Sequence, residues 1–354
     1  MNKIILLLDS FKGSISSKEI SQIGYSVLKE KFDGDVLPFS IADGGEGTTD
    51  FFINEIGYLP VLTQTVNAFL EPITTRYGVL NGTCVFDVAS CVGFAVNEGL
   101  NITKATSYGI GLVLNEIISK GYKKIYLGLG GSITNDGGIG ILEAMGAKFY
   151  FNNTEIKLHS DIFQEFDRCD LSLVLEKLQG VEIIGLCDVN NPLLGPNGAS
   201  FVYGPQKGGN LETLTLLDGV LKKLSTCFEI DSLYPGSGAA GGIGYCLRLL
   251  NGKLQSGIKS IIDELKIESL LDPNTILITG EGALDNTSFQ GKIVGYLKEL
   301  TLKHHNRLII ICGINKTTFK EDVYPLHEEL VSTYKETVRD DLRQVFNKIL
   351  IDLE

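Results

Sequence analysis

Short runs of apolar residues alternate with helical patterns of apolar and polar residues along most of the chain. Residues 3–8 form the first apolar run, and residues 16–29 follow it with the spacing of a helix. Ser16 is the expected N-cap of this helix, because Glu19 stands three residues later, as in a capping box. Further buried strands are expected at 125–129, 183–187, 275–279 and 308–312, and a further helix at 139–145. This alternation predicts an α/β protein with parallel strands.

Polar loops follow four of these apolar runs directly. Each of the loops carries Asp, Asn or Glu together with Gly. Ligands of open α/β sheets bind at the carboxyl ends of the strands. The polar loops therefore lie where this fold class places a binding site.

Residues 66–96 have a different pattern, with the alternation of hairpins around Glu71-Pro72 and Asn81-Gly82. We expect a second domain to begin near Val66, and the chain to return to the first domain later. The expected division is a discontinuous domain of residues 1–65 and 275–354, with residues 66–274 inserted into it. The charged, helical pattern of residues 321–354 predicts a covering helix.

Composition and charge narrow the function classes. The 354 residues carry a net charge of −12, which argues against DNA or RNA as a partner, because phosphate backbones are held by excess Lys and Arg. No apolar run approaches the roughly 20 residues of a membrane span, so no membrane association is expected. The seven cysteines and four histidines show no zinc-binding spacing. We expect reduced thiols in a cytoplasmic protein, as a monomer or homodimer.

Glycine is in excess, at 41 residues, and gathers with polar residues in six segments. Adjacent glycines let backbone N–H groups converge on an oxyanion. Carboxylates in the same loops suit a divalent cation that bridges them to phosphate. The pattern favours a phosphotransferase that uses magnesium and a nucleotide. The segments are 9–14, 42–48, 128–138, 187–209, 235–244 and 279–292.

Two common nucleotide-binding signatures do not fit. Gly291-Lys292 is followed by Ile293 and not by Ser or Thr, so it is no Walker A motif. The glycines at 236, 238 and 241 match a dinucleotide-binding pattern formally, but they follow Tyr234-Pro235 and not a strand. A Rossmann dinucleotide site is therefore not expected there.

Eight motifs occur in an order that resembles the bacterial, ATP-dependent glycerate kinase family, over residues 3 to about 313. The resemblance implies two α/β domains, one Rossmann-like and one inserted into it, with the active site in the cleft between them. It also implies ATP, Mg²⁺ and D-glycerate, with 2-phosphoglycerate favoured over 3-phosphoglycerate as product. The motifs are DSFKGS, ADGGEGT, GLGGSITNDGG, CDVNNPLLGPNGAS, YGPQKGG, PGSGAAGGIG, LQSGI and TGEGALD.

The chain departs from the family pattern in four places. Leu8 stands where the family has Pro, Ile133 where it has Ala, and Ala283 where it has Arg, and residues 87–89 replace a Glu-Met-Ala segment. Ala283 matters most, because an Arg in a phosphate-handling loop supplies charge-assisted hydrogen bonds. Its loss points to slow catalysis or to another hydroxy acid as substrate.

The carboxylates in these loops are the candidates for proton transfer and metal binding. Asp188 ends a buried strand and is assigned as the general base or a magnesium ligand, with a structural turn as the alternative. Asp43 is a catalytic candidate, with Glu46 beside it as a substrate contact; a helix-capping pair is the alternative. Glu281 and Asp285 flank an expected turn and are the candidate metal ligands.

The remaining candidates are donors to phosphate or to the substrate carboxylate. Lys12 is the catalytic cation, with a solvated surface lysine as the alternative reading, and Lys207 is the second cationic candidate. Local turn bonding is the alternative for the hydroxyls, and close helix packing for the glycines. The other expected contacts are Ser10, Ser132, Thr134, Asn135, Asp136, Asn191, Gly236, Gly238 and Gly241.

Three functions remain open on the sequence alone. The first is glycerate kinase activity. The second is phosphorylation of another small hydroxy acid, which Ala283 and Ile133 motivate. The third is a homologue that binds its ligand without turnover, against which the retained loop carboxylates speak.

Overall fold

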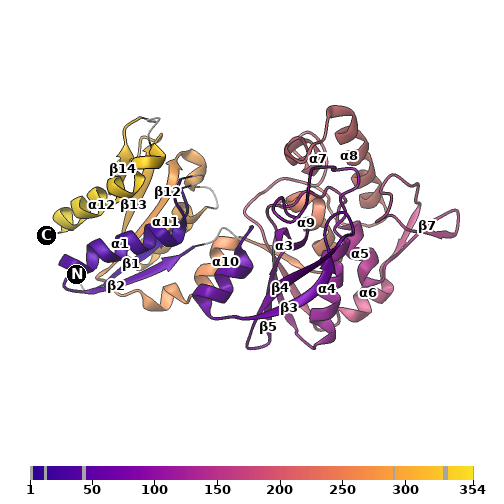
Figure 1. Cartoon of the computed structure of the whole chain (residues 1–354), viewed down its shortest axis with the longest axis horizontal. Helices are drawn as coiled ribbons and strands as arrows, with labels where there is room; N and C mark the ends of the chain where they lie inside the picture. The colour runs from indigo at the N-terminus through magenta and orange to yellow at the C-terminus, as the bar shows by residue number, and fades with distance from the viewer. Residues whose placement is uncertain (1–2, 12–13, 42–44, 290–291, 330–333, 354) are drawn as a thin grey trace. The chain divides into compact units, whose positions relative to one another are not determined.

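The computed structural model describes residues 3–11, 14–41, 45–289, 292–329 and 334–353 (Figure 1). The chain divides into two compact units. One unit is formed by Met1–Asp43 together with Ile258–Glu354, and the other by Gly44–Gly257. The first unit is thus discontinuous in sequence, and the second is inserted into it. Lys12 and Asp43, two of the predicted catalytic residues, lie outside the described residues.

The discontinuous unit contains a five-stranded parallel sheet in the order β14-β13-β12-β1-β2. Lys3 of β1 pairs with Thr275 of β12 on one side and with Asp35 of β2 on the other. The strands are β1 (Lys3–Leu8), β2 (Asp35–Ser40), β12 (Thr275–Leu284), β13 (Arg307–Asn315) and β14 (Val323–His327).

Helices cover both faces of this sheet, which explains why β1 is apolar throughout. Side chains alternate between the two faces of a strand. Ile4, Leu6 and Leu8 pack with α1 and α12, which lie side by side in Figure 1, while Ile5 and Leu7 pack with α10 and α11. The helices are α1 (Ser17–Lys31), α10 (Gly257–Glu264), α11 (Ile293–His304) and α12 (Tyr334–Leu353), with short turns η3 (Ile267–Leu270) and η4 (Asn286–Phe289).

The inserted unit contains a six-stranded mixed sheet in the order β11-β10-β6-β5-β4-β3. β5, β6, β10 and β11 run parallel, whereas β3, β4 and β5 pair antiparallel. The predicted hairpin turn at Asn81-Gly82 is confirmed, and both residues have positive φ, as a tight two-residue turn requires. The strands are β3 (Leu59–Val66), β4 (Pro72–Leu80), β5 (Thr83–Asp87), β6 (Lys124–Gly128), β10 (Glu182–Leu186) and β11 (Lys253–Gln255).

Helices and a small second sheet complete the inserted unit. A three-stranded sheet has the order β8-β7-β9, with β7 (Lys148–Phe151), β8 (Thr154–Ile156) and β9 (Arg168–Asp170). The longer helices are α4 (Tyr108–Ser119), α5 (Ile139–Met145), α8 (Leu211–Thr226) and α9 (Ala239–Leu249). The shorter ones are α2 (Thr48–Phe51), η1 (Phe52–Ile56), α3 (Ala89–Val92), α6 (Ser172–Lys177), α7 (Ala199–Tyr203) and η2 (Pro205–Lys207).

The sequence-based expectations hold for most elements. β1 and α5 have the predicted bounds, and Ser16 caps α1, with its hydroxyl accepting from the N–H of Glu19 at 3.3 Å. β12 is longer than predicted: it continues through Leu284, because Glu281, Ala283 and Leu284 keep pairing with β13. Glu281 therefore lies within a strand and not beside a turn. The strand β14, in the segment read as helical, was not predicted.

The boundaries between the units fall earlier than the expected positions at 65/66 and 274/275. β3 explains the first difference, because all eight of its residues pair with β4 and join the sheet of the inserted unit. α10 explains the second, because Ile258 and Ile262 pack in the core of the discontinuous unit. Among the described helices, none is both long and apolar enough to cross a membrane.

Candidate active site

The parallel strands of the inserted unit end together at one edge of the sheet. Leu186 of β10 pairs with Gly128 of β6 and with Gln255 of β11. The segments that follow these three strands therefore leave the sheet side by side. They contain the glycine loop 129–138, the segment 187–192 and Ser256. This edge carries Asp188 and five of the predicted ligand contacts, which are Ser132, Thr134, Asn135, Asp136 and Asn191.

Asp188 is the first polar side chain after β10. Its Oδ1 accepts from the Ser256 hydroxyl at 2.8 Å and from the N–H of Gly257 at 3.0 Å. Both donors come from the segment after β11, so adjacent strand ends fix the direction of the carboxylate. The side chain stays half-buried. A carboxylate held in one direction can accept a proton from a bound hydroxyl.

Lys207 reaches the glycine loop from η2. Its side chain is buried, and Nζ donates to the carbonyl oxygen of Thr134 at 2.7 Å and to the hydroxyl of Ser132 at 3.2 Å. Burial lowers the pKa of Lys207 to about 7, although the charge of Asp136 acts in the opposite direction. The structure thus brings together three of the predicted ligand contacts, Lys207, Ser132 and Thr134.

Two buried polar atoms of the same loop have no hydrogen-bond partner among the described residues. They are Oγ1 of Thr134 and Oδ1 of Asn135. The other end of the Asn135 amide is fixed, because Nδ2 donates to the hydroxyl of Ser200 in α7 at 2.8 Å. Buried polar groups nearly always have partners, so these two atoms are positions where a ligand can supply the missing bonds.

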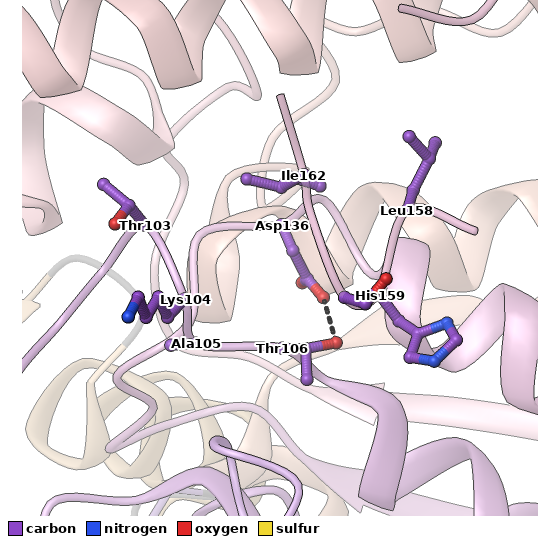
Figure 2. A pocket seen from close by; sticks show the side chains of 9 residues that line it. Thr103, Lys104, Ala105, Thr106, Asp136, Leu158, His159 and Ile162 are labelled. Carbon is purple, nitrogen blue, oxygen red and sulfur yellow. Dashed lines mark hydrogen bonds between the residues drawn. The ribbon is translucent and has the colours of Figure 1, made fainter. Parts of the chain in front are cut away.

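Asp136 has its acceptor positions taken within the protein. Its Oδ2 accepts from the N–H and the hydroxyl of Ser107, both at 2.8 Å, and from the N–H of Gly140 at 3.2 Å. Oδ1 accepts from the N–H of Gly138 at 3.0 Å, and Thr106 lies 3.5 Å from Oδ2 beside a small pocket (Figure 2). These bonds assign Asp136 to positioning the loop and not to contacting a ligand.

The predicted glycines of 235–244 serve close packing of the backbone. An added Cβ would lie 2.0 Å from the Thr134 oxygen at Gly241, and 2.3 Å from the Pro192 oxygen at Gly238. At Gly236 the nearest atom, on Leu254, would lie at 3.1 Å, and φ is positive. Glycine there lets the start of α9 approach the segments after β6 and β10. Of the two uses expected for these glycines, the structure shows close packing.

Asn191 holds the segment between β10 and α7. Its Nδ2 donates to the carbonyl oxygen of Asn197 at 2.9 Å, and its Oδ1 accepts from the hydroxyl of Tyr203 at 2.5 Å. The amide is therefore occupied at both ends. Asn191 stiffens the loop that follows Asp188.

Glu46 lies against the glycine loop. Its Oε2 would be 3.2 Å from a Cβ added at Gly131, and Gly130 packs so closely on Gly45 that an added Cβ would lie 2.6 Å from the Gly45 Cα. Two glycine segments distant in sequence thus bring an exposed carboxylate beside Gly131. Its predicted neighbour Asp43 lies outside the described residues.

The discontinuous unit carries acidic residues of its own: Asp9 and Asp285 directly follow β1 and β12, and Glu281 lies within β12. Burial raises the pKa of Glu281; Ser288 and Lys292 act against this shift, and the charges of Asp285 and Asp9 add to it. Lys292 Nζ lies 3.8 Å from Oε2 of Glu281, and Oε1 is buried without a partner among the described residues. Ser10 donates its N–H to Asp9 at 2.6 Å.

These carboxylates fit Mg²⁺ only with help from a substrate. No three acidic, His or Cys side chains within the described ranges are grouped to hold a metal by themselves. Mg²⁺ in phosphoryl-transfer sites commonly uses one or two carboxylates plus substrate phosphates and water. The orphaned oxygen and raised pKa of Glu281 are what such a cation would relieve.

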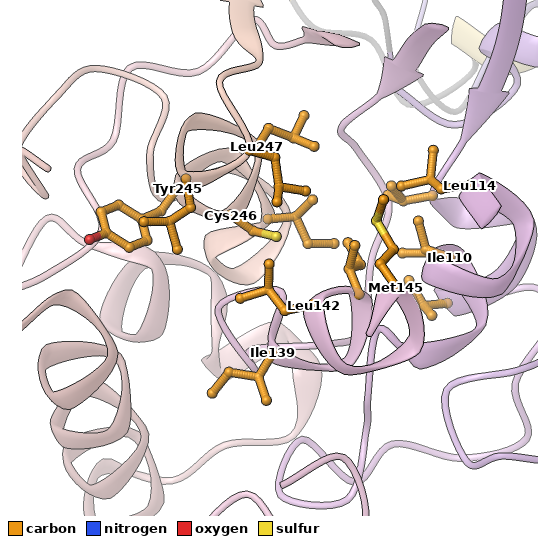
Figure 3. Packing of buried hydrophobic residues seen from close by; sticks show 14 of the residues in the cluster. Ile110, Leu114, Ile139, Leu142, Met145, Tyr245, Cys246 and Leu247 are labelled. Atoms are coloured by element: carbon orange, nitrogen blue, oxygen red, sulfur yellow. The ribbon is translucent and has the colours of Figure 1, made fainter. Parts of the chain in front are cut away.

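A tightly packed core supports the glycine loop. Figure 3 shows Ile110 and Leu114 of α4, Leu142 of α5 and Cys246 of α9 within one apolar cluster. Gly138 sits so close to α9 that an added Cβ would lie 2.3 Å from the Cys246 Cβ. Because packed interiors deform little, this core holds the loop in one arrangement.

Several contributing residues were not singled out by the sequence. Asp9 follows β1 directly, and the rule that selected Asp188 after β10 could have found it. Ser256, which bonds Asp188, follows β11, a strand of only three residues that the periodicity does not reveal. Ser107 and Ser200 act through long-range bonds, for which a single sequence holds no signal.

A family model and sequence relatives both match this chain to glycerate kinases. The model of the glycerate kinase family matches residues 4–343. A protein of Escherichia coli (strain K12) named glycerate 2-kinase is 32% identical over 338 residues, covering 92% of this chain and 88% of the relative. A glycerate kinase of Bacillus subtilis (strain 168) is 32% identical over 303 residues, covering 82% and 79%.

A solved structure agrees with the sequence relatives. A crystal structure assigned as a candidate glycerate kinase 2 from Salmonella typhimurium LT2 matches with a TM-score of 0.84 at 27% identity. That match covers 99% of this chain and 98% of the other. The family match, the sequence relatives and the shared fold together show that this chain belongs to the glycerate kinase family.

Proposed function

We propose that this kinase transfers the γ-phosphoryl group of ATP to a hydroxyl of D-glycerate, with Mg²⁺, and that 2-phosphoglycerate is the favoured product. The observation that carries the proposal is the edge of the inserted sheet, where Asp188 and the glycine loop 129–138, which Lys207 contacts, follow adjacent strands. The name of the Escherichia coli relative supports the 2-hydroxyl as acceptor.

Asp188 is the proposed general base. An alcohol must lose its proton as it attacks phosphorus, and a carboxylate with a fixed direction accepts that proton efficiently. The bonds from Ser256 and Gly257 hold one oxygen, so the side chain keeps its orientation. Lys12 and Asp43 keep their predicted catalytic roles within this proposal.

The glycine loop 129–138, together with Lys207, is the proposed contact for an oxyanion of the ligand. Ser132, Thr134 and Asn135 of the glycine loop offer hydroxyl and amide groups, and Lys207 of η2 adds a buried amine. Phosphoryl transfer depends mostly on positioning and on stabilising negative charge. Donors held rigidly by Asp136 and the glycine packing meet both needs.

Glu281 and Asp285 are the proposed Mg²⁺ ligands, with Asp9 as a further acidic neighbour. When bound, Mg²⁺ would neutralise phosphate charge during transfer. Glu281 contributes a buried oxygen that has no partner among the described residues. Lys292 limits the repulsion among the carboxylates until the cation arrives.

Another small hydroxy acid remains the alternative substrate. Of the two residues that suggested it, only Ala283 still supports it. Ile133, the other motive for it, is fully buried, and its N–H donates to the carbonyl oxygen of Val92 at 2.8 Å. Its side chain belongs to the core and cannot select a substrate. Ala283 is half-buried on β12, where an Arg would add a cation near Glu281.

A coupled assay of ADP release tests the activity. We expect release that requires both Mg-ATP and D-glycerate, and little with L-glycerate or without an acceptor. Release with another hydroxy acid but not with D-glycerate would replace the substrate assignment. Tight binding of both ligands without product would instead indicate a homologue that binds without turnover.

A further inference from the structure

The amine of Lys207 donates hydrogen bonds to two acceptors in the described structure. Its acceptors are the carbonyl oxygen of Thr134 and the hydroxyl oxygen of Ser132. A neutral amine carries two N–H groups and satisfies both, whereas an ammonium group carries a third that would need another acceptor. Within the described part of the chain, the structure gives this amine no third acceptor.

The charges around Lys207 leave it poorly compensated. Both of its acceptors are neutral. Asp136 is the acidic group whose charge acts on the amine, and the carboxylate of Asp136 is already occupied by donors from Ser107, Gly138 and Gly140. Glu46, a further acidic residue that the structure describes at the loop, lies against Gly131 and is exposed to solvent. A buried charge without a close partner is unfavourable, so burial favours the neutral amine.

The same loop holds acceptor and donor atoms without partners, at Thr134 Oγ1 and Asn135 Oδ1. Thr134 is fully buried and Asn135 is 1% exposed. The Thr134 hydroxyl is an independent sign that the loop is completed by a bound group, because it is a donor that an oxyanion can accept together with the amine of Lys207. The Asn135 Oδ1 only accepts, so it would pair with a donor of the ligand and not with the oxyanion.

We propose that Lys207 is uncharged in the free protein above neutral pH and takes up one proton when an oxyanion of a ligand binds at its loop. The proton comes from the buffer, adds to the nitrogen lone pair, and gives the ammonium group its third N–H for the anion. No other bond forms or breaks. This inference rests on the proposed function in so far as the ligand is a substrate of the kinase.

The physical consequence is binding linked to protonation. The pKa of Lys207, lowered to about 7 by burial, leaves the free amine mostly neutral at pH 8 and mostly charged at pH 6. Ligand binding should therefore take up about 0.9 of a proton at pH 8 and about 0.1 at pH 6. Affinity should fall as the pH rises above 7, by about tenfold per pH unit.

Calorimetry on the full chain measures this uptake directly. D-glycerate, sulfate and Mg-ATP are titrated separately at pH 8 and pH 6, in buffers that differ in ionisation enthalpy. None of these ligands takes up protons appreciably at pH 8. We expect an apparent enthalpy that varies with the buffer at pH 8 and hardly at pH 6, for at least one ligand. Binding heats independent of the buffer at pH 8 for every ligand that binds would overturn the proposal.

Stability provides a second measurement that needs no ligand. Lys207 has a lower pKa folded than unfolded, so the unfolded chain binds the extra proton between about pH 7 and 10. As the pH rises through this range, the equilibrium constant for unfolding should therefore decrease more steeply in the native chain than in Lys207→Met. The difference should be about a factor of ten per pH unit. Lys222→Met, at an exposed lysine of α8, is the matched control and should keep the native slope.

The outcomes separate this inference from the kinase assignment. Equal pH slopes for the native chain and Lys207→Met would show that Lys207 is charged in the free protein and would overturn the inference. Proton uptake without D-glycerate-dependent ADP release would support the inference and contradict the substrate. Turnover with D-glycerate but no proton uptake on binding would support the substrate and contradict the inference about Lys207.

Discussion

The carboxylate of Asp136 and the hydroxyl of Ser107 form a reciprocal link between the first turns of two helices. The Ser107 hydroxyl donates to Asp136 at 2.8 Å and accepts from the N–H of Ile141 in α5 at 3.1 Å. Asp136 accepts the N–H of Ser107, at the start of α4, and of Gly140 in α5. A negative charge at two helix N-termini is stabilised by both helix dipoles. The link fixes Thr134 and Asn135, which immediately precede it.

Replacing Asp136 should destabilise the chain strongly. Asp136→Asn puts an N–H₂ group among donors and leaves some of them unpaired, so we expect a loss of about 2–4 kcal/mol in the free energy of unfolding. Ser107→Ala removes fewer bonds and should lose about 1–2 kcal/mol. Urea unfolding measures both. A loss below 0.5 kcal/mol for Asp136→Asn (roughly the scale of a surface substitution) would contradict the positioning role.

Gly241 should tolerate no side chain. Gly241→Ala places a Cβ 2.0 Å from the Thr134 oxygen at a φ of +70°, so we expect a loss of about 1–3 kcal/mol and a weakened site. Gly219→Ala is the matched control, because its Cβ meets nothing within 4 Å on helix α8. That variant should be stabilised by about 0.5–1 kcal/mol. Equal stability of the two variants would argue against close packing at Gly241.

Asp188→Asn should lose turnover and keep the fold. The amide cannot accept the hydroxyl proton, so kcat should fall by about 10²–10⁴-fold, with a melting temperature close to that of the native chain. Asp340→Asn, at an exposed position of α12, is the control and should keep full activity. Full turnover of Asp188→Asn would show that another group accepts the proton.

Glu281→Gln should make the chain more stable and weaken its use of Mg²⁺. The folded pKa of Glu281 is raised by burial, so its charge at neutral pH opposes folding, and stability is lost as the pH rises through that pKa. The neutral Gln should therefore unfold at a higher temperature at pH 7 than the native chain. It should also need more Mg²⁺ for half-maximal rate. An unchanged Mg²⁺ requirement would remove Glu281 from the proposed ligands.

The sequence predicts local elements well here because local physics specifies them. Apolar runs and capping signals define β1, α1 and α5, since burial on both faces and a Ser N-cap need no distant partner. The extension of β12 depends on pairing of Glu281 and Leu284 with β13, which no local pattern reveals. The boundary near Val66 was misplaced for the same reason, because β3 joins its sheet through β4.

For the candidate site too, residue type predicts which residues gather there, but long-range contacts decide their roles. Lys207, Ser132 and Thr134 were chosen by residue type in glycine loops, and the structure brings them together. Residue type cannot separate a ligand contact from an internal anchor, so Asp136 and Asn191 were placed with the contacts. Their long-range partners Ser107 and Tyr203 show that they hold the loops.

Phosphorus NMR of the product shows which hydroxyl of D-glycerate receives the phosphate. The chain is incubated with Mg-ATP and D-glycerate, and the new phosphate-ester signal is recorded with proton coupling. We expect a doublet, because phosphate on the 2-hydroxyl couples to the single proton of that carbon. A triplet from the two protons of the terminal carbon would show 3-phosphoglycerate and contradict the assigned acceptor. No new ester signal from folded protein would contradict the substrate itself.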